Sequence, residues 1–231
     1  MEMEVDRGVD GVFVVAHELK APLAVLRQLA FALPEMELEG ERTRSEIVRV
    51  SERAIRQVND FLRMGRLEDG LFEMEPVAIR AVCDDVTREL ARLFETNGRG
   101  VRVRYMNRTK LVNANAELLF SVIYNFLVNA ARYSNEGTET VLSVGDARGK
   151  VRVSIRDYGP SLPIKIWRKI KEGGLERPVD IAMRPGSTGL GLYIASKFSH
   201  YMGAEVGAVR HRDGVSFYIE LPISRQLSLF D

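Results

Sequence analysis

The feature that most constrains this chain is an unbroken seam of apolar residues at its amino-terminal end. The seam is spaced alternately by four and three residues: Val5, Val9, Val12, Ala16, Leu19, Leu23, Leu26, Ala30 and Leu33. This spacing keeps the apolar side chains on one side of a helix and is typical of a helix packed lengthwise against other helices. We therefore expect a long helix over residues 4–33, followed by a turn at Pro34 and the acidic run up to Gly40.

A second helical pattern covers residues 41–67. Two sets of apolar residues recur there every seven positions: Ile47, Ala54 and Phe61, and Val48, Ile55 and Leu62. Two helices with a short connection should lie antiparallel. A single hairpin would leave both apolar stripes half exposed, so we expect a second copy to complete a four-helix bundle. A plain coiled-coil spacer would also explain the stripes.

A histidine and a proline lie close together in the first helical pattern. His17 comes directly after a seam position, about 100° further around the helix, so its ring should lie at the edge of the buried stripe. Pro22 lies inside the same pattern, where a proline costs about 3 kcal/mol and frees the carbonyl of Glu18. Taken alone, the pair also fits a surface histidine beside a tolerated proline kink.

Composition narrows the class of protein. The 231 residues, of which 45% are hydrophobic, suit one or two globular domains. A net charge of +1 gives no argument for nucleic-acid binding. No stretch approaches the roughly 18 apolar residues of a membrane span, and no signal peptide is visible. The single cysteine, Cys83, fits a reducing compartment. We therefore expect a cytoplasmic chain, or the cytoplasmic part of a larger protein, without a membrane segment.

The hydrophobic period changes at Glu68-Asp69-Gly70, so we place a boundary between a domain of residues 1–68 and one of residues 69–231. The expected helices are 79–97, 115–133, a short one around Ile166, and 190–201. The expected strands are 101–105, 141–144, 151–155, 204–209 and 215–221, and residues 71–77 should form a strand or an extended connection. Residues 145–149 should form a hairpin loop, and residues 158–187 a mobile loop rich in glycine and proline. The mixture predicts a two-layer α/β sandwich with a mostly antiparallel sheet.

Two asparagines stand out in the expected helix 115–133. Asn125 and Asn129 lie four residues apart, so their amides project from one helix face, and Arg132 and Tyr133 follow one turn later. Amide oxygens belong to the hard ligands that Mg²⁺ accepts. On the residues alone, a polar solvated helix face is the favoured interpretation of the two asparagines.

Two further segments flank the loop at 158–187. Asp157-Tyr158-Gly159 ends an expected strand. An ionised carboxylate only accepts hydrogen bonds, so it favours an amino group over a carbonyl, although an aspartate in a strand-ending turn is also common. Gly186-Ser187-Thr188-Gly189-Leu190-Gly191-Leu192 leads into a helix. Backbone N–H groups at such a helix start can approach phosphates, and simple helix capping gives the same pattern.

Together these motifs resemble a known family. His17-Glu18-Leu19-Lys20-Ala21-Pro22-Leu23 resembles the H-box of sensor histidine kinases. Residues 125–134 resemble the N-box, residues 157–159 the G1 box and residues 186–192 the G2 box, in that family's order. The resemblance spans roughly residues 5–222. The chain departs from the family at Ser161, where a second glycine is usual. It departs again at Trp167, a lone aromatic where a paired-aromatic F-box is frequent, which could anchor a lid or fill the core.

The resemblance implies a two-component histidine kinase that uses ATP and Mg²⁺. His17 would be the phospho-acceptor, with Glu18 as its catalytic partner. Asn129, supported by Asn125, would hold the metal, and Asp157 would accept a hydrogen bond from adenine. The cofactor-binding residues implied in this way are Asn125, Asn129, Arg132, Tyr133, Asp157, Gly159, Thr188, Gly189, Leu190, Gly191 and Leu192. The implied partners are a second copy in a homodimer and the receiver domain of a response regulator, with no nucleic acid.

A rival interpretation is a catalytically weak, dimeric pseudokinase that serves as a scaffold. Ser161 and the missing F-box aromatics favour it, whereas His17, Asn129 and Asp157 argue against it. A GHKL ATPase of the repair, gyrase or chaperone type would leave the H-box unexplained.

The sequence also supports predictions for His200, His211 and Ala21. His200 and His211 lack the Glu-Leu-Lys-Ala-Pro context, so we expect them to be structural or solvated. Ala21 stands where kinases of this type that also dephosphorylate their regulator usually carry Thr or Asn. A methyl group cannot hold a water molecule, so we expect weak phosphatase activity.

Overall fold

The computed structural model describes residues 24–26, 28, 40–106, 110–172 and 189–225. The chain divides after Glu68 into two compact units, Met1–Glu68 and Asp69–Asp231. Residues 24–26 and 28 are helical; the rest of the helix expected over residues 4–33, with its H-box, lies outside the described residues. Within the described segments, no helix is long and apolar enough to cross a bilayer.

In the first unit, helix α2 runs over Gly40–Gly65 and confirms the second helical pattern. Val48, Ile55 and Leu62 form a row along it, and their exposed fractions are 49%, 60% and 58%. Residues seven apart lie on the same face of a helix, so α2 presents a continuous apolar stripe to its surroundings.

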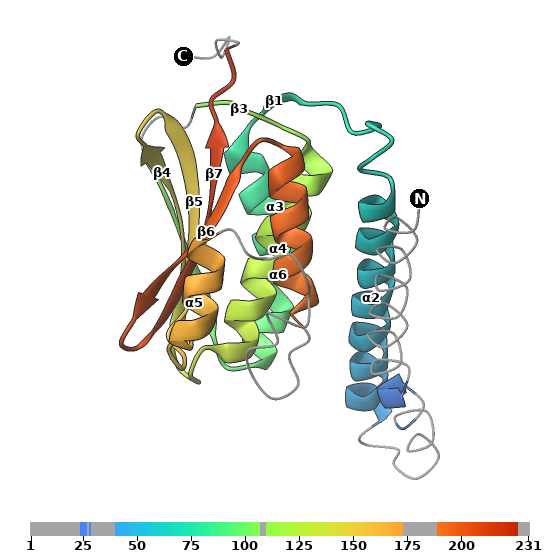
Figure 1. Cartoon of the computed structure of the whole chain (residues 1–231). Coiled ribbons are helices and arrows are strands. Elements are labelled where there is room, and N and C mark those ends of the chain that lie inside the picture. Colours follow the sequence, from blue (N-terminus) through green and yellow to red (C-terminus); the bar gives the residue numbers. More distant parts are fainter. Residues whose placement is uncertain (1–23, 27, 29–39, 107–109, 173–188, 226–231) are drawn as a thin grey trace. The chain divides into compact units, whose positions relative to one another are not determined.

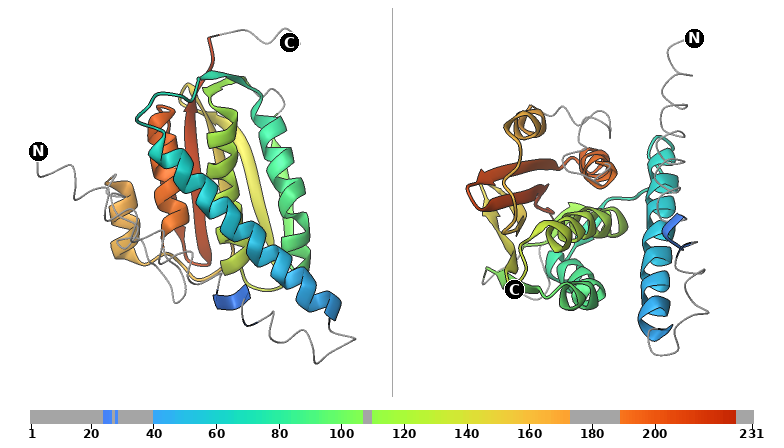
Figure 2. Two further views of the ribbon diagram at one scale, coloured as in Figure 1. Left: turned by 90° about the vertical axis from the view of Figure 1, so that its right-hand side faces the viewer. Right: turned by 90° about the horizontal axis from the view of Figure 1, so that it is seen from below.

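The second unit has two layers (Figure 1). Its five-stranded sheet has the order β2 (Gly100–Tyr105), β4 (Glu139–Ala147), β5 (Lys150–Arg156), β7 (Gly214–Pro222) and β6 (Glu205–His211). Among the described strand pairings of this sheet, only β2–β4 is parallel. Helices α3 (Ile79–Thr96), α4 (Ala116–Tyr133) and α6 (Leu190–Tyr201) lie side by side over one face of the sheet (Figure 2). The predicted two-layer, mostly antiparallel sandwich is confirmed.

The core lies between these two layers. Strand β5 alternates, with Val151, Val153 and Ile155 buried and the residues between them half-buried. Phe126 of α4 stacks on Phe217 of β7, with ring centroids 5.7 Å apart. A buried phenylalanine contributes about 1.5–3 kcal/mol, so this contact helps to fix α4 on the sheet.

The expected hairpin loop at 145–149 is wrong, because the turn is only Arg148-Gly149. Both residues have positive φ, 47° and 82°, as a tight two-residue hairpin turn requires. Gly145 lies inside β4, paired with Arg152. A Cβ at Gly145 would lie 2.8 Å from the sulfur of Met106, so this glycine makes room for a neighbour and does not start the turn.

Two further boundaries differ from the expectation. Strand β6 extends to His211, so this histidine ends a strand and the turn is Arg212-Asp213. A small sheet pairs β1 (Glu75–Val77) with β3 (Val112–Ala114). Strand β3 was not predicted, because three residues are too few for a recognisable alternation.

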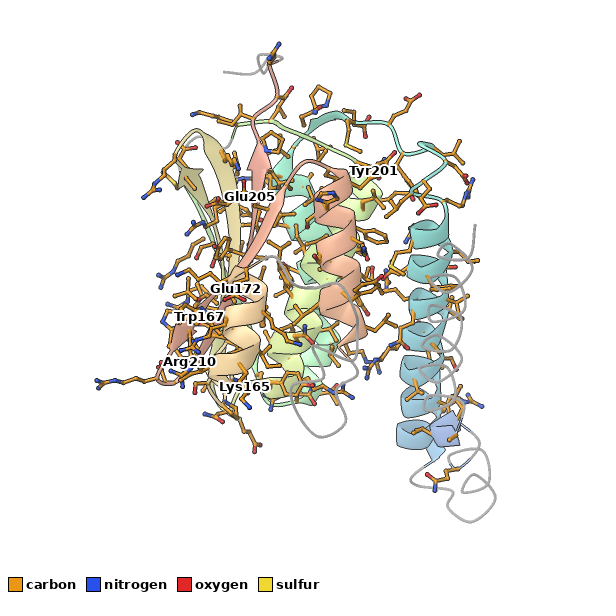
Figure 3. All side chains as sticks on the ribbon, in the orientation of Figure 1. Lys165, Trp167, Glu172, Tyr201, Glu205 and Arg210 are labelled. Carbon is orange, nitrogen blue, oxygen red and sulfur yellow. The ribbon has the colours of Figure 1, made fainter. Side chains whose placement is uncertain are left out.

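The short helix expected around Ile166 is confirmed as α5, Ile164–Lys171. The indole N–H of Trp167 donates to the carbonyl of Ala208 in β6, at 3.0 Å, and thereby ties α5 to the edge of the sheet. Arg210 donates from Nε to the carbonyl of Leu162, at 2.7 Å (Trp167 and Arg210 are labelled in Figure 3). Residues 173–187 of the expected mobile loop lie outside the described residues, so a lid role for Trp167 stays a prediction.

Candidate functional site

Helix α4 supplies the predicted asparagine face. It is capped by Asn115, whose side chain accepts from the N–H of Leu118 at 3.1 Å. Asn125 and Asn129 are half-buried, whereas Phe126 between them is fully buried. The amide nitrogen of Asn125 donates to the carbonyl of Ser121 at 2.9 Å. This bond fixes the rotamer of Asn125 within its own helix.

The first turn of α6 lies directly against Asn125. Gly189 caps α6 with φ of 73°, a conformation that suits glycine. A Cβ at Gly191 would lie 2.8 Å from Oδ1 of Asn125, closer than side chains tolerate. The glycine motif and the asparagine motif, far apart in the sequence, therefore meet, and glycine makes the approach possible.

The segment after β5 lies against the carboxyl end of α4. A Cβ at Gly159 would lie 2.8 Å from the main-chain carbon of Tyr133. The N–H of Asn135 donates to the carbonyl of Tyr158, at 2.9 Å. The two glycine-containing motifs, at Gly159 and Gly191, thus both contact α4, which carries the asparagine motif.

Asp157 is buried, with an exposed fraction of 2%. Its Oδ1 accepts from the backbone N–H groups of Val215, at 3.1 Å, and Gly159, at 3.3 Å. Two backbone donors satisfy a buried carboxylate and fix its orientation. Such a group can present a defined acceptor to a ligand.

The other predicted site residues divide by exposure. Arg132 is exposed and Tyr133 half-buried, both in the last turn of α4. Leu190 and Leu192 are buried, so only their backbone N–H groups could meet a ligand. His17, Glu18 and Thr188 lie outside the described residues.

The β6–β7 hairpin belongs to this site and was missed by sequence reasoning. Val215 holds the carboxylate of Asp157, and the neighbouring Gly214 packs against the same aspartate. The run Arg212-Asp213-Gly214 between two alternating stretches signals a hairpin turn, but nothing in it indicates contact with residue 157.

The two remaining described histidines have the predicted character. Nε2 of His211 shares a hydrogen bond with Oγ of Ser216, at 2.9 Å, so His211 is held within the sheet. Burial, followed by the nearby charge of Arg156, lowers the pKa of His211 from its ordinary value. His200 is an exposed residue in the last turn of α6.

Two sequence families match the chain. The family described as "His Kinase A (phospho-acceptor) domain" matches residues 14–70, and "Histidine kinase-, DNA gyrase B-, and HSP90-like ATPase" matches residues 114–225. The chain belongs to the histidine kinases. This histidine kinase is also similar to the alginate biosynthesis sensor protein KinB of Pseudomonas aeruginosa, with 26% identity over 230 residues. The match covers 92% of this chain but only 36% of KinB, so the kinase described here corresponds to about a third of that relative's length.

Solved structures of histidine kinases share the fold. Full-length ShkA in complex with AMPPNP is 25% identical, with a TM-score of 0.63 over 92% of this histidine kinase and 45% of ShkA. ThkA in complex with the response regulator protein TrrA is 18% identical, with a TM-score of 0.61 over 91% of this chain and 60% of that one.

Proposed function

We propose that this chain is the catalytic part of a two-component system kinase: it autophosphorylates His17 from ATP and passes the phosphoryl group to an aspartate of a response regulator. The observation that carries the proposal is the convergence on α4. Gly191 approaches Asn125, Gly159 approaches Tyr133, and the carboxylate of Asp157 is held beside them. The match of residues 14–70 to a phospho-acceptor family includes His17 and supports its assignment as the acceptor.

The assigned nucleotide contacts follow from the chemistry of each group. Asp157 accepts a hydrogen bond from the 6-amino group of adenine, and Tyr133 packs on the base. The backbone N–H groups from Thr188 to Leu192 and the guanidinium of Arg132 face the phosphates. The AMPPNP complex of the similar kinase ShkA supports nucleotide binding in this fold.

A magnesium ion fits the donor set. Asn129, supported by Asn125, offers an amide oxygen, and Mg²⁺ typically keeps water and phosphate ligands around few protein oxygens. Among the described residues, no group of three or more His, Cys, Asp or Glu side chains could hold a metal on its own. The ion would therefore arrive with the nucleotide, where it neutralises phosphate charge.

The reaction itself is phosphoryl transfer to nitrogen. A neutral ring nitrogen of His17 attacks the γ-phosphorus in line, an N–P bond forms, and the bond to the β-phosphate oxygen breaks to release ADP. An imidazole of ordinary pKa, about 6.5, is largely neutral at pH 7. Glu18 orients the ring or takes its proton. Because ATP is the donor, we place the reaction in the cytoplasm.

The proposal includes a homodimer. The stripe of Val48, Ile55 and Leu62 leaves large apolar side chains exposed along α2. Such a stripe is typical of a helix that needs a further helix to cover it, and a second copy supplies the same stripe by symmetry.

The deciding experiment follows the fate of the γ-phosphate. With ATP radiolabelled there, the protein should acquire label that is lost in acid and stable in base. His17→Gln should abolish labelling and leave the dissociation constant for ATP within a few-fold, because acceptor and nucleotide lie in different domains. His200→Gln is the matched control and should keep its label. Full labelling of the His17→Gln protein would contradict the proposal, and no labelling of the unmodified protein would favour the pseudokinase scaffold.

A further inference from the structure

At Asp157, the hydrogen bonds between β5 and β7 depart from the pattern of a regular antiparallel pair. In an antiparallel sheet, a hydrogen-bonded pair of residues exchanges two main-chain bonds. Asp157 keeps the first, since its N–H donates to the carbonyl of Val215 at 2.9 Å. The N–H of Val215, however, donates to Oδ1 of Asp157, at 3.1 Å. The carboxylate thus takes the ladder position of its own main-chain carbonyl.

The displaced carbonyl is satisfied by the preceding residue. Nη1 of Arg156 donates to the carbonyl oxygen of Asp157, and Nη2 donates to Oδ1 of Asp213 in the hairpin turn, at 2.6 Å. The same guanidinium lies over the ring of Tyr158, 4.4 Å from its centroid. The Arg156 side chain is only 16% exposed. Three partners therefore hold one guanidinium beside the carboxylate.

Gly214 makes room for this arrangement. Its φ is 144°, which side-chain-bearing residues rarely adopt. A Cβ there would lie 2.8 Å from Oδ1 of Asp157 and would also meet that residue's carbonyl and the Arg156 guanidinium. The hairpin backbone thus approaches the aspartate as closely as the chain allows.

We propose that Arg156 is a positioning residue for adenine recognition. It keeps the main-chain carbonyl of Asp157 out of the ladder, so that the carboxylate stays bound to Val215 and faces the base. Without the guanidinium, this buried carbonyl would lose its donor and compete for the N–H of Val215, because buried carbonyls require a partner. The carboxylate would then lose its fixed orientation. This inference rests on the proposed role of Asp157 in the nucleotide site.

Arg152 provides a matched control on the same strand. It lies four residues earlier with its side chain on the same face of β5. It donates to Oε1 of Glu220 from Nε, at 2.8 Å, and its guanidinium lies 4.3 Å from the ring centroid of Tyr218. Arg152 therefore has the same kinds of partners as Arg156, an acid and a tyrosine, and none of them is Asp157.

The experiment compares Arg156→Met and Arg152→Met in the full chain. Binding is measured by calorimetry for ATP and for purine riboside triphosphate, which lacks only the 6-amino group. Arg156→Met should raise the dissociation constant for ATP about tenfold or more, the range of one misplaced charged hydrogen bond. It should change the constant for purine riboside triphosphate by less than about twofold. Arg152→Met should leave both constants unchanged. Arg156→Lys should give an intermediate loss, since an ammonium lacks the planar fork.

Each outcome of the binding comparison supports or contradicts the positioning role of Arg156. An equal loss of both nucleotides in Arg156→Met, or no loss of ATP, would overturn the positioning role. If Arg156→Met does not fold, Asp213→Asn removes the ion pair that orients the guanidinium, and it should weaken ATP selectively by a few-fold. Equal binding of both nucleotides by the unmodified protein, with no effect of Asp157→Asn, would instead refute the proposed role of Asp157 itself.

Discussion

Burial decides which reactive side chains of this kinase can take part in chemistry. Cys83 of α3 is completely buried, and burial, followed by the charge of Asp84, raises the pKa of its thiol to about 12. Tyr105 on β2 donates to a carboxylate oxygen of the same Asp84, at 2.5 Å. Burial and this hydrogen bond raise the pKa of Tyr105 as well. Both groups therefore stay protonated at neutral pH, and Cys83 serves to fill the core.

Cys83 should accordingly resist alkylation in the native protein. Only the thiolate reacts, and at pH 8 a thiol of pKa about 12 is ionised in roughly one molecule in ten thousand. Mass spectrometry after iodoacetamide treatment at pH 8 should show no adduct on native protein and one adduct after unfolding in guanidinium. Cys83→Ser should show none in either state. Rapid modification of the native chain would mean that the α3 side of the core opens readily.

At the level of elements, the contact between α4 and α6 depends on one missing side chain. Gly191 lies within the first turn of α6, where alanine would ordinarily favour the helix by about 1 kcal/mol. The 2.8 Å approach to Asn125 opposes that gain. Helix propensity thus favours alanine at position 191, whereas the packing of α6 against α4 favours glycine.

We predict that Gly191→Ala lowers the free energy of unfolding by about 1–2 kcal/mol, because overpacking outweighs helix propensity. Asn125→Ala removes the crowded oxygen. In that background Gly191→Ala should be neutral or stabilising. Urea denaturation of the four proteins gives the coupling energy. Equal effects of Gly191→Ala in both backgrounds would show that the helices do not meet at this contact.

Long elements could be predicted from the sequence, and contacts between distant residues could not. Helix α6 was predicted within its observed bounds, because Gly189 and the apolar period mark it. The predicted loop of the first hairpin began too early, at Gly145, because a glycine within a strand gives the same sequence signal as a turn. Asp157 was singled out, but its bond to Val215, 58 residues later in the sequence, depends on the register of two strands, which no local pattern encodes. The role of His17 stays a prediction.

At the level of the whole molecule, the first unit leaves an apolar stripe on α2 uncovered, and assembly would cover it. We predict that Ile55→Asp, at the centre of the stripe, shifts the protein from dimer to monomer. A charge placed in an apolar helical interface is left without a partner. Gln57→Glu adds the same charge about 200° away around the helix and should stay dimeric. Analytical ultracentrifugation distinguishes the two, and an unchanged dimer in Ile55→Asp would place the interface elsewhere.

The small β1–β3 sheet bears on whether the second unit can be moved between proteins by gene fusion. Val112 of β3 pairs with Val77 on one side and forms a bridge with Ile223 on the other. Val77 in the first strand of this unit and Ile223, just after its last described strand, therefore lie about 10 Å apart, two strand spacings. A unit whose first and last described strands lie this close can be inserted into another polypeptide with little distortion of either. Gene fusion could thus carry this unit between proteins as a single cassette, with the proposed nucleotide site intact.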